Sequence, residues 1–437
     1  MSISKKLRVV SRAPLYQLAL CFALIGNTAS IFAADQPLSL NEAQRLAVAR
    51  SHQLSGQNNA INAAHDMAIA ARQLPDPVVK FGVDNLPVSG SDRFSLGNDF
   101  MTMRRVGVMQ EITRADKLKY RSEQFEISAQ KTLAEKTLNI ASIQRDTALA
   151  WLERYYTEKQ LALIAEQIKQ AQLENQAAQS AYKGGRNSQA DALTAESAVV
   201  MMEDRQIELH AKLNNAKTQL FRWVGSEGDG LLAEPPDLTH VTLESSNLST
   251  QLAQHPQLNI LAKQEQLANA EASLARANKQ PDWTVEVNFQ QRGAAYSNMI
   301  SVGLSFPLQW DHRNRHDRDV SAKLAMLAQA GSERLESQRM LIAEAQTTLT
   351  EWHSKRERLA RFQTTLLPLA QQRVAASLAA YRGGKLSLSE LLASQNKEIE
   401  TRLQSLQLEA DAAKLWIALQ FLTVHLAPSP ASGRRLG

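Results

Sequence analysis

The sequence has few residues that break helices, cross-link folds or carry reactive thiols. Its 437 residues include 13 prolines, 18 glycines and one cysteine, Cys21. Because the prolines and glycines are clustered, long stretches of the chain are free to be helical. A chain without cysteine after residue 34 fits an oxidising compartment, where a stray thiol is a liability. No run of about twenty apolar residues follows that point, which excludes a membrane-spanning helix there.

Catalytic motifs are also missing. The sequence contains no recognisable nucleophile–histidine–acid set, glycine-rich phosphate loop or zinc-ligand cluster. We therefore expect neither enzymatic activity nor a cofactor. The formal charge of +5 depends on residues 1–34, which hold four basic and no acidic residues; without them it is 45 − 44 = +1. The basic isoelectric point therefore does not indicate nucleic-acid binding.

Residues 1–34 have the pattern of a secretory signal peptide. A basic stretch at 5–12 precedes an apolar core at 15–25 and a small-residue end at Ala33-Ala34. Cys21 follows Leu20 instead of a small residue, which argues against a lipoprotein signal. We expect these residues to be removed from the mature protein.

The rest of the sequence contains an internal repeat. The segment Tyr182-Lys183-Gly184-Gly185-Arg186-Asn187-Ser188 matches Tyr381-Arg382-Gly383-Gly384-Lys385-Leu386-Ser387, 199 residues later. The match continues with Asp191 against Glu390 and Leu193 against Leu392, and upstream Pro75-Asp76 matches Pro281-Asp282 at an offset of 206. A period near 200 is too long for a solenoid unit of about 20–50 residues, so the sequence predicts one duplicated architecture.

Both copies predict the same order of elements: a short helix, two strands, a very long helix, a Gly-Gly turn and a return helix. The first repeat is expected over 35–225, with a strand hairpin at 78–112, a long helix at 117–183 and a return helix at 188–225. The second is expected over 257–426, with a hairpin at 283–307, a long helix at 317–382 and a return helix at 387–426. Residues 226–256 are the predicted linker, and 427–437 a polar tail.

The predicted strands alternate apolar and polar residues, as in Trp283-Thr284-Val285-Glu286-Val287 and again from Ile300 to Phe306. This alternation is typical of a half-buried hairpin packed on helices, or of a transmembrane strand of about 9–11 residues. The candidate at 101–112 is less regular.

The predicted long helices exceed ordinary globular lengths. Residues 117–182 contain no proline or glycine and as a helix would span roughly 100 Å. Apolar residues at three- and four-residue spacing indicate a narrow coiled-coil seam, with Leu161, Ile164, Ile168 and Ala171 in the first helix and Leu324, Leu327, Leu335, Ile342, Leu349 and Trp352 in the second. Pro368 is predicted to interrupt the second helix and is a candidate hinge.

Four strands in one chain cannot close a barrel, and lipid does not tolerate an open strand edge. If the strands span a membrane, three copies would supply 4 × 3 = 12 strands, a common outer-membrane size. The expected fold class is therefore mainly α with a small β part: duplicated strand-hairpin and long helical-hairpin units. As a trimer, these would form a 12-stranded outer-membrane β-barrel, continued by a periplasmic α-helical coiled-coil barrel.

The doubled Tyr-x-x-Gly-x-x-Ser motif with its following Asp/Glu-x-Leu, together with this order of elements, resembles the TolC family of outer-membrane efflux proteins. The resemblance covers essentially the whole chain after residue 34. The stretches Leu74-Pro75-Asp76-Pro77, Asn85-Leu86-Pro87 and Asp99-Phe100-Met101-Thr102-Met103-Arg104 are most similar to the outer-membrane components of heavy-metal efflux systems of the CusC and CzcC type.

The resemblance implies a homotrimeric exit duct for heavy-metal cations in the outer membrane of a Gram-negative bacterium, with a large periplasmic part. Its implied partners are outer-membrane lipid, a periplasmic adaptor and a proton-driven inner-membrane pump of the resistance-nodulation-division class. A multidrug or type I secretion channel is the alternative cargo class. A soluble periplasmic coiled-coil adaptor or scaffold is the alternative from another class.

The resemblance also places both Gly-Gly turns at a periplasmic tip, where adaptor hairpins dock and the entrance dilates. The residues it implies there are Tyr182, Gly184, Gly185, Arg186, Ser188, Asp191, Tyr381, Gly383, Gly384, Lys385, Ser387 and Glu390. The glycines would permit a tight reversal, and the serines would cap the return helices. The alternative is a helix-hairpin turn with no docking role. Residues 179–181 and 377–380 contain no carboxylate, so we expect no acidic ring at that level.

Two groups of side chains are candidate metal ligands. His312 and His316 are four apart and flanked by Asp311 and Asp317, but the arginines at 313, 315 and 318 repel cations. Met101, Met103 and Met109 could bind copper(I), although their spacing on a strand also fits one packing face. We expect no metal site in either group. Trp283 and Trp310 suit an aromatic belt at a membrane interface or core packing.

Overall fold

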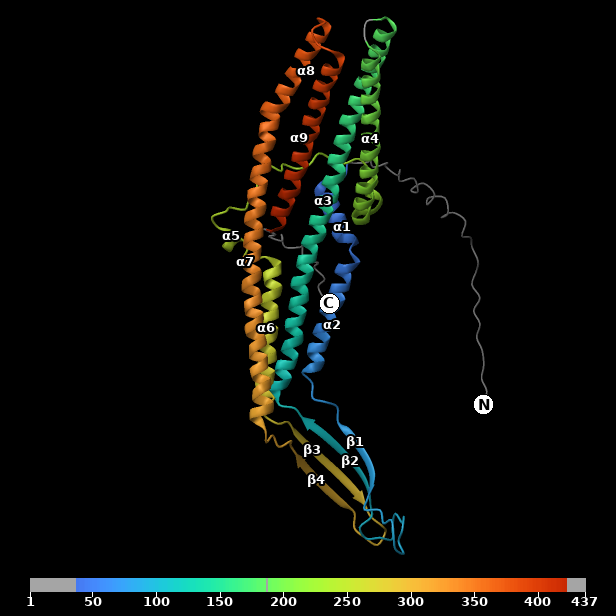
Figure 1. Ribbon diagram of the computed structural model, residues 1–437. Helices are drawn as coiled ribbons and strands as arrows, with labels where there is room; N and C mark the ends of the chain where they lie inside the picture. The colour runs from blue at the N-terminus through green and yellow to red at the C-terminus, as the bar shows by residue number, and fades with distance from the viewer. Residues whose placement is uncertain (1–36, 186–187, 423–437) are drawn as a thin grey trace, which may run out of the picture.

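The structure is a computed structural model that describes residues 37–185 and 188–422. The predicted signal peptide, Arg186 and the predicted tail lie outside the described residues. A bundle of long helices ends in a small sheet, and two helical hairpins reach the opposite end of the molecule (Figure 1). The sheet and the two Gly-Gly turns are therefore at opposite ends.

Each repeat contributes helices on both sides of a strand hairpin. The first contains α1 (Leu40–Arg50), α2 (His52–Ala71), β1 (Val78–Asp84), β2 (Met103–Ile112), α3 (Ala115–Lys183) and α4 (Gln189–Val224). A 3-10 turn, η1 (Gly225–Asp229), and α5 (Leu248–Gln251) join the repeats. The second contains α6 (Pro256–Ala277), β3 (Trp283–Gln291), β4 (Met299–Ser305), a π turn η2 (His312–His316), α7 (Asp317–Arg361), a π turn η3 (Phe362–Leu366), α8 (Leu367–Arg382) and α9 (Leu388–Leu422).

Helix α3 alone has 69 residues, which corresponds to roughly 100 Å. None of the helices in the described ranges combines the length and the apolar character needed to cross a membrane.

Two elements differ from their predicted form. The strand predicted from residue 101 begins at Met103, because Met101 belongs to a turn in which its N–H donates to Asp99 (3.1 Å). The helix predicted over 317–382 is divided by η3. Pro368 lacks the N–H that an α-helix would use at this point, and the wider π turn lies just before it.

The four strands form one antiparallel sheet in the order β1-β2-β3-β4, so the two predicted hairpins join edge to edge through β2 and β3. The register places apolar side chains opposite one another across all four strands, as in the row Phe81, Val106, Phe289 and Ile300. This apolar face is solvent-exposed in the single chain: Phe81 is 77% exposed and Ile300 is 74% exposed. The alternative prediction, that the face packs on helices, is wrong.

The opposite face of the sheet is polar and ion-paired. Lys80 Nζ lies 2.8 Å from Glu286 Oε2, and Asn288 Nδ2 donates to the other oxygen of Glu286 at 3.0 Å. Gly107 lies between these residues in the register, and a Cβ there would be 1.9 Å from Asn288 Oδ1. The glycine therefore leaves the space that the Asn288 side chain occupies beside Glu286.

The largest core cluster lies where α1, α3, α4 and α9 meet. Trp151 is fully buried there, stacks on Tyr155 at 5.4 Å between ring centroids, and donates its indole N–H to the Leu38 carbonyl (2.9 Å). This cluster holds the N-terminal segment and both return helices against α3.

The predicted seams are only partly buried. In the first, Ile164 and Ile168 pack in one cluster with Ile399 and Leu403 of α9. In the second, Leu349 and Trp352 are buried. Leu324 and Leu335 are exposed in the single chain, so the half of this seam nearer the sheet is not packed within one copy.

His255 predicts a pH dependence of stability. It is buried at the start of α6, where its Nδ1 accepts a hydrogen bond from the Gln257 N–H (3.3 Å). Burial lowers the pKa of His255 below its ordinary value of 6.5, although the Glu344 charge and a hydrogen bond to the Phe421 backbone oppose this effect. Because the folded pKa is the lower one, this contribution to stability is complete above pH 6.5 and is lost as the pH falls below it.

We therefore expect the free energy of unfolding of the wild-type protein to be lower at about pH 5 than at about pH 7. The difference is about 1.4 kcal/mol for each unit by which folding lowers the pKa, and the denaturation midpoint at the two pH values measures it. The control is His255→Asn, which keeps a helix-capping side chain but does not titrate. An equal fall in the variant would assign the pH dependence to other groups.

Candidate functional site

The chain reverses direction between α3 and α4 and again between α8 and α9. At the second turn the Gly384 N–H donates to the Tyr381 carbonyl (3.0 Å) and the Lys385 N–H to the Ala380 carbonyl (2.9 Å). This pair of bonds is the Schellman closure, with Gly384 in the left-handed conformation at φ 69°. At the first turn the Gly185 N–H donates to Tyr182 (2.9 Å), and Gly185 also has φ 69°.

The four glycines of these turns are therefore not equivalent. Gly184 and Gly383 end their helices at φ −83° and −81°, which other residues adopt readily. Only Gly185 and Gly384 need the conformational freedom of glycine. The prediction that all four permit the reversal is wrong for the first glycine of each pair.

Each return helix begins with a reciprocal cap. The Asp191 N–H donates to Ser188 Oγ (3.1 Å), and the Ser188 N–H donates to Asp191 Oδ2 (3.3 Å). In the second copy the Glu390 N–H donates to Ser387 Oγ (3.3 Å), and the Ser387 N–H donates to Glu390 Oε2 (3.0 Å). Hydrogen bonds from the Ser387 backbone and hydroxyl lower the pKa of Glu390. These serines and carboxylates thus shape the turns, and the exposed Lys385 is left to face outward.

The two turns expose different side chains. Tyr182 is exposed, whereas Tyr381 packs against a cluster of Ala178, Ala195, Leu388, Leu391 and Leu392. That cluster joins α3, α4 and α9, so the ends of the two helical hairpins touch each other. Below it, Gln395 Nε2 donates to Glu174 Oε1 at 2.6 Å. The sequence motif shows the likeness of the turns but not this contact between them.

The histidine pair lies in η2, just before α7. The rings of His312 and His316 are 5.6 Å apart. Their acidic neighbours are already engaged: Asp311 caps Asn314 (3.0 Å), and Asp317 pairs with Lys279 (2.5 Å). No cluster of three or more His, Cys, Asp or Glu side chains suited to a metal is found in residues 37–185 and 188–422.

The three methionines do not come together. Met103 and Met109 lie on the same strand six residues apart, which is about 20 Å along β2, and Met101 is in the preceding turn. Of the two tryptophans, Trp283 packs on Phe306 at 5.1 Å between centroids, whereas Trp310 is 85% exposed.

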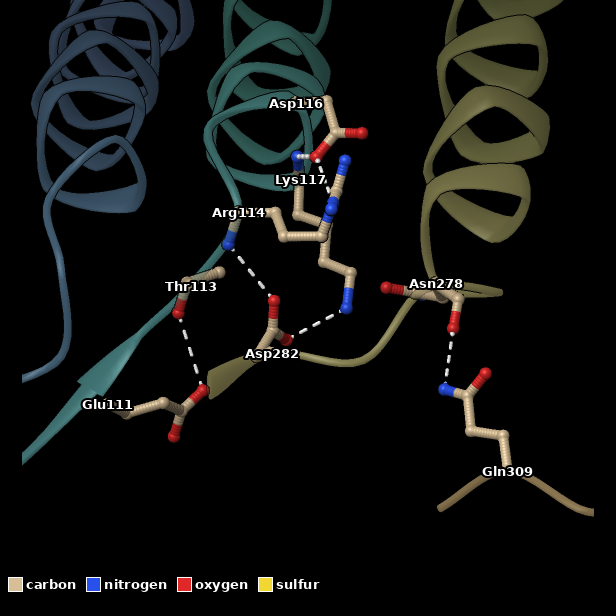
Figure 2. Close-up of polar contacts among 8 residues, drawn as sticks. All are labelled: Glu111, Thr113, Arg114, Asp116, Lys117, Asn278, Asp282 and Gln309. Atoms are coloured by element: carbon tan, nitrogen blue, oxygen red, sulfur yellow. Dashed lines mark hydrogen bonds and ion pairs between the residues drawn. The ribbon is translucent and has the colours of Figure 1, made fainter. Parts of the chain in front are cut away.

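A buried polar contact lies where the sheet meets the helices, and it involves the aspartate of the second Pro-Asp pair (Figure 2). Asp282, just before β3, accepts from Lys117 Nζ (2.8 Å) and from the Arg114 backbone N–H (3.0 Å) at the start of α3. The Lys117 side chain is only 5% exposed. The sequence shows a Pro-Asp pair before the first strand of each repeat, but it does not predict the contact between Asp282 and Lys117, which depends on the fold.

Comparison with known proteins gives matches to solved structures. No protein-family model and no curated protein sequence matches the chain. Three similar structures are those of CusC, in a study of transmembrane channel formation, the Campylobacter jejuni CmeC outer membrane channel and the outer membrane protein VceC from Vibrio cholerae.

All three comparisons extend over nearly the full length of both proteins. Identities are 16%, 12% and 16%, with TM-scores of 0.73, 0.74 and 0.72. Each alignment covers 88% of this chain, and 91%, 85% and 96% of the respective relative. The fold is therefore shared over most of each chain at low sequence identity.

Proposed function

We propose that this chain, which has the fold of the TolC family of outer-membrane efflux proteins, forms the exit channel of a tripartite pump. The observation that carries the proposal is the exposed apolar face of the sheet, at one end of a helical body whose two hairpins extend the other way (Figure 1). An apolar sheet face of this kind is suited to lipid, while the polar face with Lys80 and Glu286 is suited to a water-filled lumen.

The open edges of β1 and β4 support assembly with other copies. Both are sheet edges without a partner strand within the described chain. Three copies, edge to edge, would give a 12-stranded barrel in the outer membrane. The helices below it would surround a continuous passive duct into the periplasm.

The tips at the far end are the proposed docking surface for a periplasmic adaptor, which would connect the duct to an inner-membrane pump. Tyr182 and Lys385 offer an exposed ring and a cation there. We propose that opening separates the hairpin α8–α9 from α3–α4, breaking the Gln395–Glu174 contact, with η3 and Pro368 as the hinge.

For the cargo we propose heavy-metal cations. The resemblance of the segments around Asp76, Asn85 and Asp99 to heavy-metal efflux components supports this. Selection of the ion would belong to the pump and adaptor, because the duct itself does no chemistry.

The test is growth of a deletion strain on graded copper, silver, zinc, cobalt and nickel, with antibiotics in parallel. We expect metal sensitivity that the intact gene reverses. Sensitivity confined to antibiotics would keep the duct and overturn the cargo. A protein extracted without detergent would overturn the channel and favour the soluble scaffold.

The same strain tests opening at the tips. We expect Glu174→Cys with Gln395→Cys, treated with a short bifunctional thiol cross-linker, to lose efflux, and each single variant treated identically to keep it. Cys21, in the predicted signal peptide, is the chain's one native cysteine, so the linker has no other target in the mature protein. Normal efflux by the linked pair would contradict opening at this contact.

A further inference from the structure

The internal repeat gives a numerical relation between the two strand hairpins. Val78 pairs with Met109 in the first hairpin and Thr284 with Ser305 in the second. The two hairpins therefore superpose with offsets of 284 − 78 = 206 for the leading strand and 305 − 109 = 196 for the following strand. The offset of 206 is also that of the Pro-Asp motif, so sequence and register agree.

Adding 196 to a β2 residue gives its counterpart in β4, and subtracting 206 from a β3 residue gives its counterpart in β1. Applied to the β2–β3 pairs, these offsets give the expected pairing between neighbouring copies. The pairs Val106↔Phe289 and Val108↔Val287 become Val302↔Val83 and Leu304↔Phe81, with β4 of one copy against β1 of the next. Both of these converted pairs match an apolar residue with an apolar residue on the exposed face, whereas Ile300 falls opposite Asn85, one residue beyond the end of β1. A shift of one residue would place apolar side chains against polar ones.

The same conversion applies to the junction in Figure 2. Asp282 minus 206 is Asp76, and Lys117 plus 196 is Arg313. Within one chain Asp282 and Lys117 form a 2.8 Å ion pair. The side chains of Asp76 and Arg313 instead are both exposed and form no hydrogen bond or ion pair with any residue in 37–185 and 188–422. The acid position therefore holds an acid in both repeats. The strand offset places Lys117 at Arg313, which is one residue from the position given by the helix caps Arg114 and Asp311, 311 − 114 = 197.

We infer that the Asp76 carboxylate of one copy forms an ion pair with the Arg313 guanidinium of the neighbouring copy, at the junction where β1 of the first meets β4 of the second. This inference rests on the proposed function, because it needs copies assembled edge to edge. The repeated aspartate then forms the same kind of ion pair twice: Asp282 links the two repeats within a chain, and Asp76 links one chain to the next.

The acidic residues near Arg313 already have partners within the chain. Asp311 accepts a hydrogen bond from Asn314, and Asp317 forms an ion pair with Lys279. On the donating side the Pro75 carbonyl accepts from Gln110 Nε2 at 2.7 Å, which fixes the backbone beside Asp76. Arg315 also lies exposed in η2, but its counterpart, 315 − 196 = 119, is Lys119, which is not bonded to Asp282.

The test is charge reversal in the full chain, purified in detergent, with the trimer fraction measured by native mass spectrometry over a dilution series. We expect Asp76→Arg and Arg313→Asp each to raise the protein concentration at which half of the trimer dissociates about tenfold or more. Each single variant places two like charges opposite one another between copies. The double variant restores attraction and should return to near the wild-type midpoint. Arg315→Asp, with the same change of charge two residues away, is the matched control and should dissociate like the wild type.

The outcomes separate this inference from the proposed function. Single variants that assemble like the wild type, or a double variant no better than the singles, would overturn the ion pair while leaving the channel intact. A wild-type protein that is monomeric in detergent and dispensable for efflux would overturn the proposed function itself. A disulfide between chains in Phe81→Cys with Leu304→Cys would support the register, since directly opposed Cβ atoms lie about 5 Å apart; its absence under oxidation would contradict the register.

Discussion

Replacing Trp151 with alanine is expected to lower the free energy of unfolding by about 3–5 kcal/mol. The side chain is fully buried, so truncation leaves a large cavity among four helices. It also removes the stacking on Tyr155 and leaves the Leu38 carbonyl without its indole donor. A guanidinium titration of the detergent-solubilised protein, followed by far-ultraviolet circular dichroism, measures the loss.

The same substitution at Trp310 is the control. That side chain is 85% exposed, so Trp310→Ala should change the free energy of unfolding by no more than about 0.5 kcal/mol. Equal losses at the two positions would mean that the cluster around Trp151 is not the main core of the helical body.

Asp282→Ala is expected to cost about 3–5 kcal/mol, because it leaves the Lys117 ammonium buried without a counter-charge. The loss would be seen in the same titration. It should exceed the cost of an exposed pair such as Arg361 with Glu357, which is on the order of 0.5 kcal/mol or less.

A double variant isolates the cause. Lys117→Met fills similar space without charge, so Asp282→Ala combined with Lys117→Met should be more stable than Asp282→Ala alone. If the two losses simply add, the cost at Asp282 comes from its hydrogen bond to the Arg114 backbone, and the buried-charge explanation is wrong.

Patterns of local spacing predicted most of the architecture. The Gly-Gly motif located both turns, and the absence of proline and glycine over 117–182 located α3, which spans Ala115–Lys183. Strand alternation gave the two faces of the sheet, because a period of two depends only on neighbouring residues. The resemblance to the TolC family is confirmed at the level of the fold by the similar structures.

Features that depend on distant residues were not predictable in this way. The partial burial of Tyr381 depends on Ala178 and Ala195, about 200 residues away. The division of the glycines follows from backbone angles that the letters Gly-Gly do not specify. The start of β2 at Met103 depends on the turn bond between Thr102 and Asn85 (3.1 Å).

The pairing of β2 with β3 also has a consequence for the order of folding. It joins residues as far apart as Arg104 and Gln291, and the Lys117–Asp282 contact beside it spans 165 residues. Contacts of such high sequence separation form late, after the intervening helical hairpin of α3 and α4. Until the second repeat has been delivered, the first hairpin has an apolar face and an unpaired β2 edge, both open to aggregation. Those two surfaces stay open until nearly 200 further residues have been added to the chain, so the first repeat on its own is expected to aggregate more readily than the whole chain.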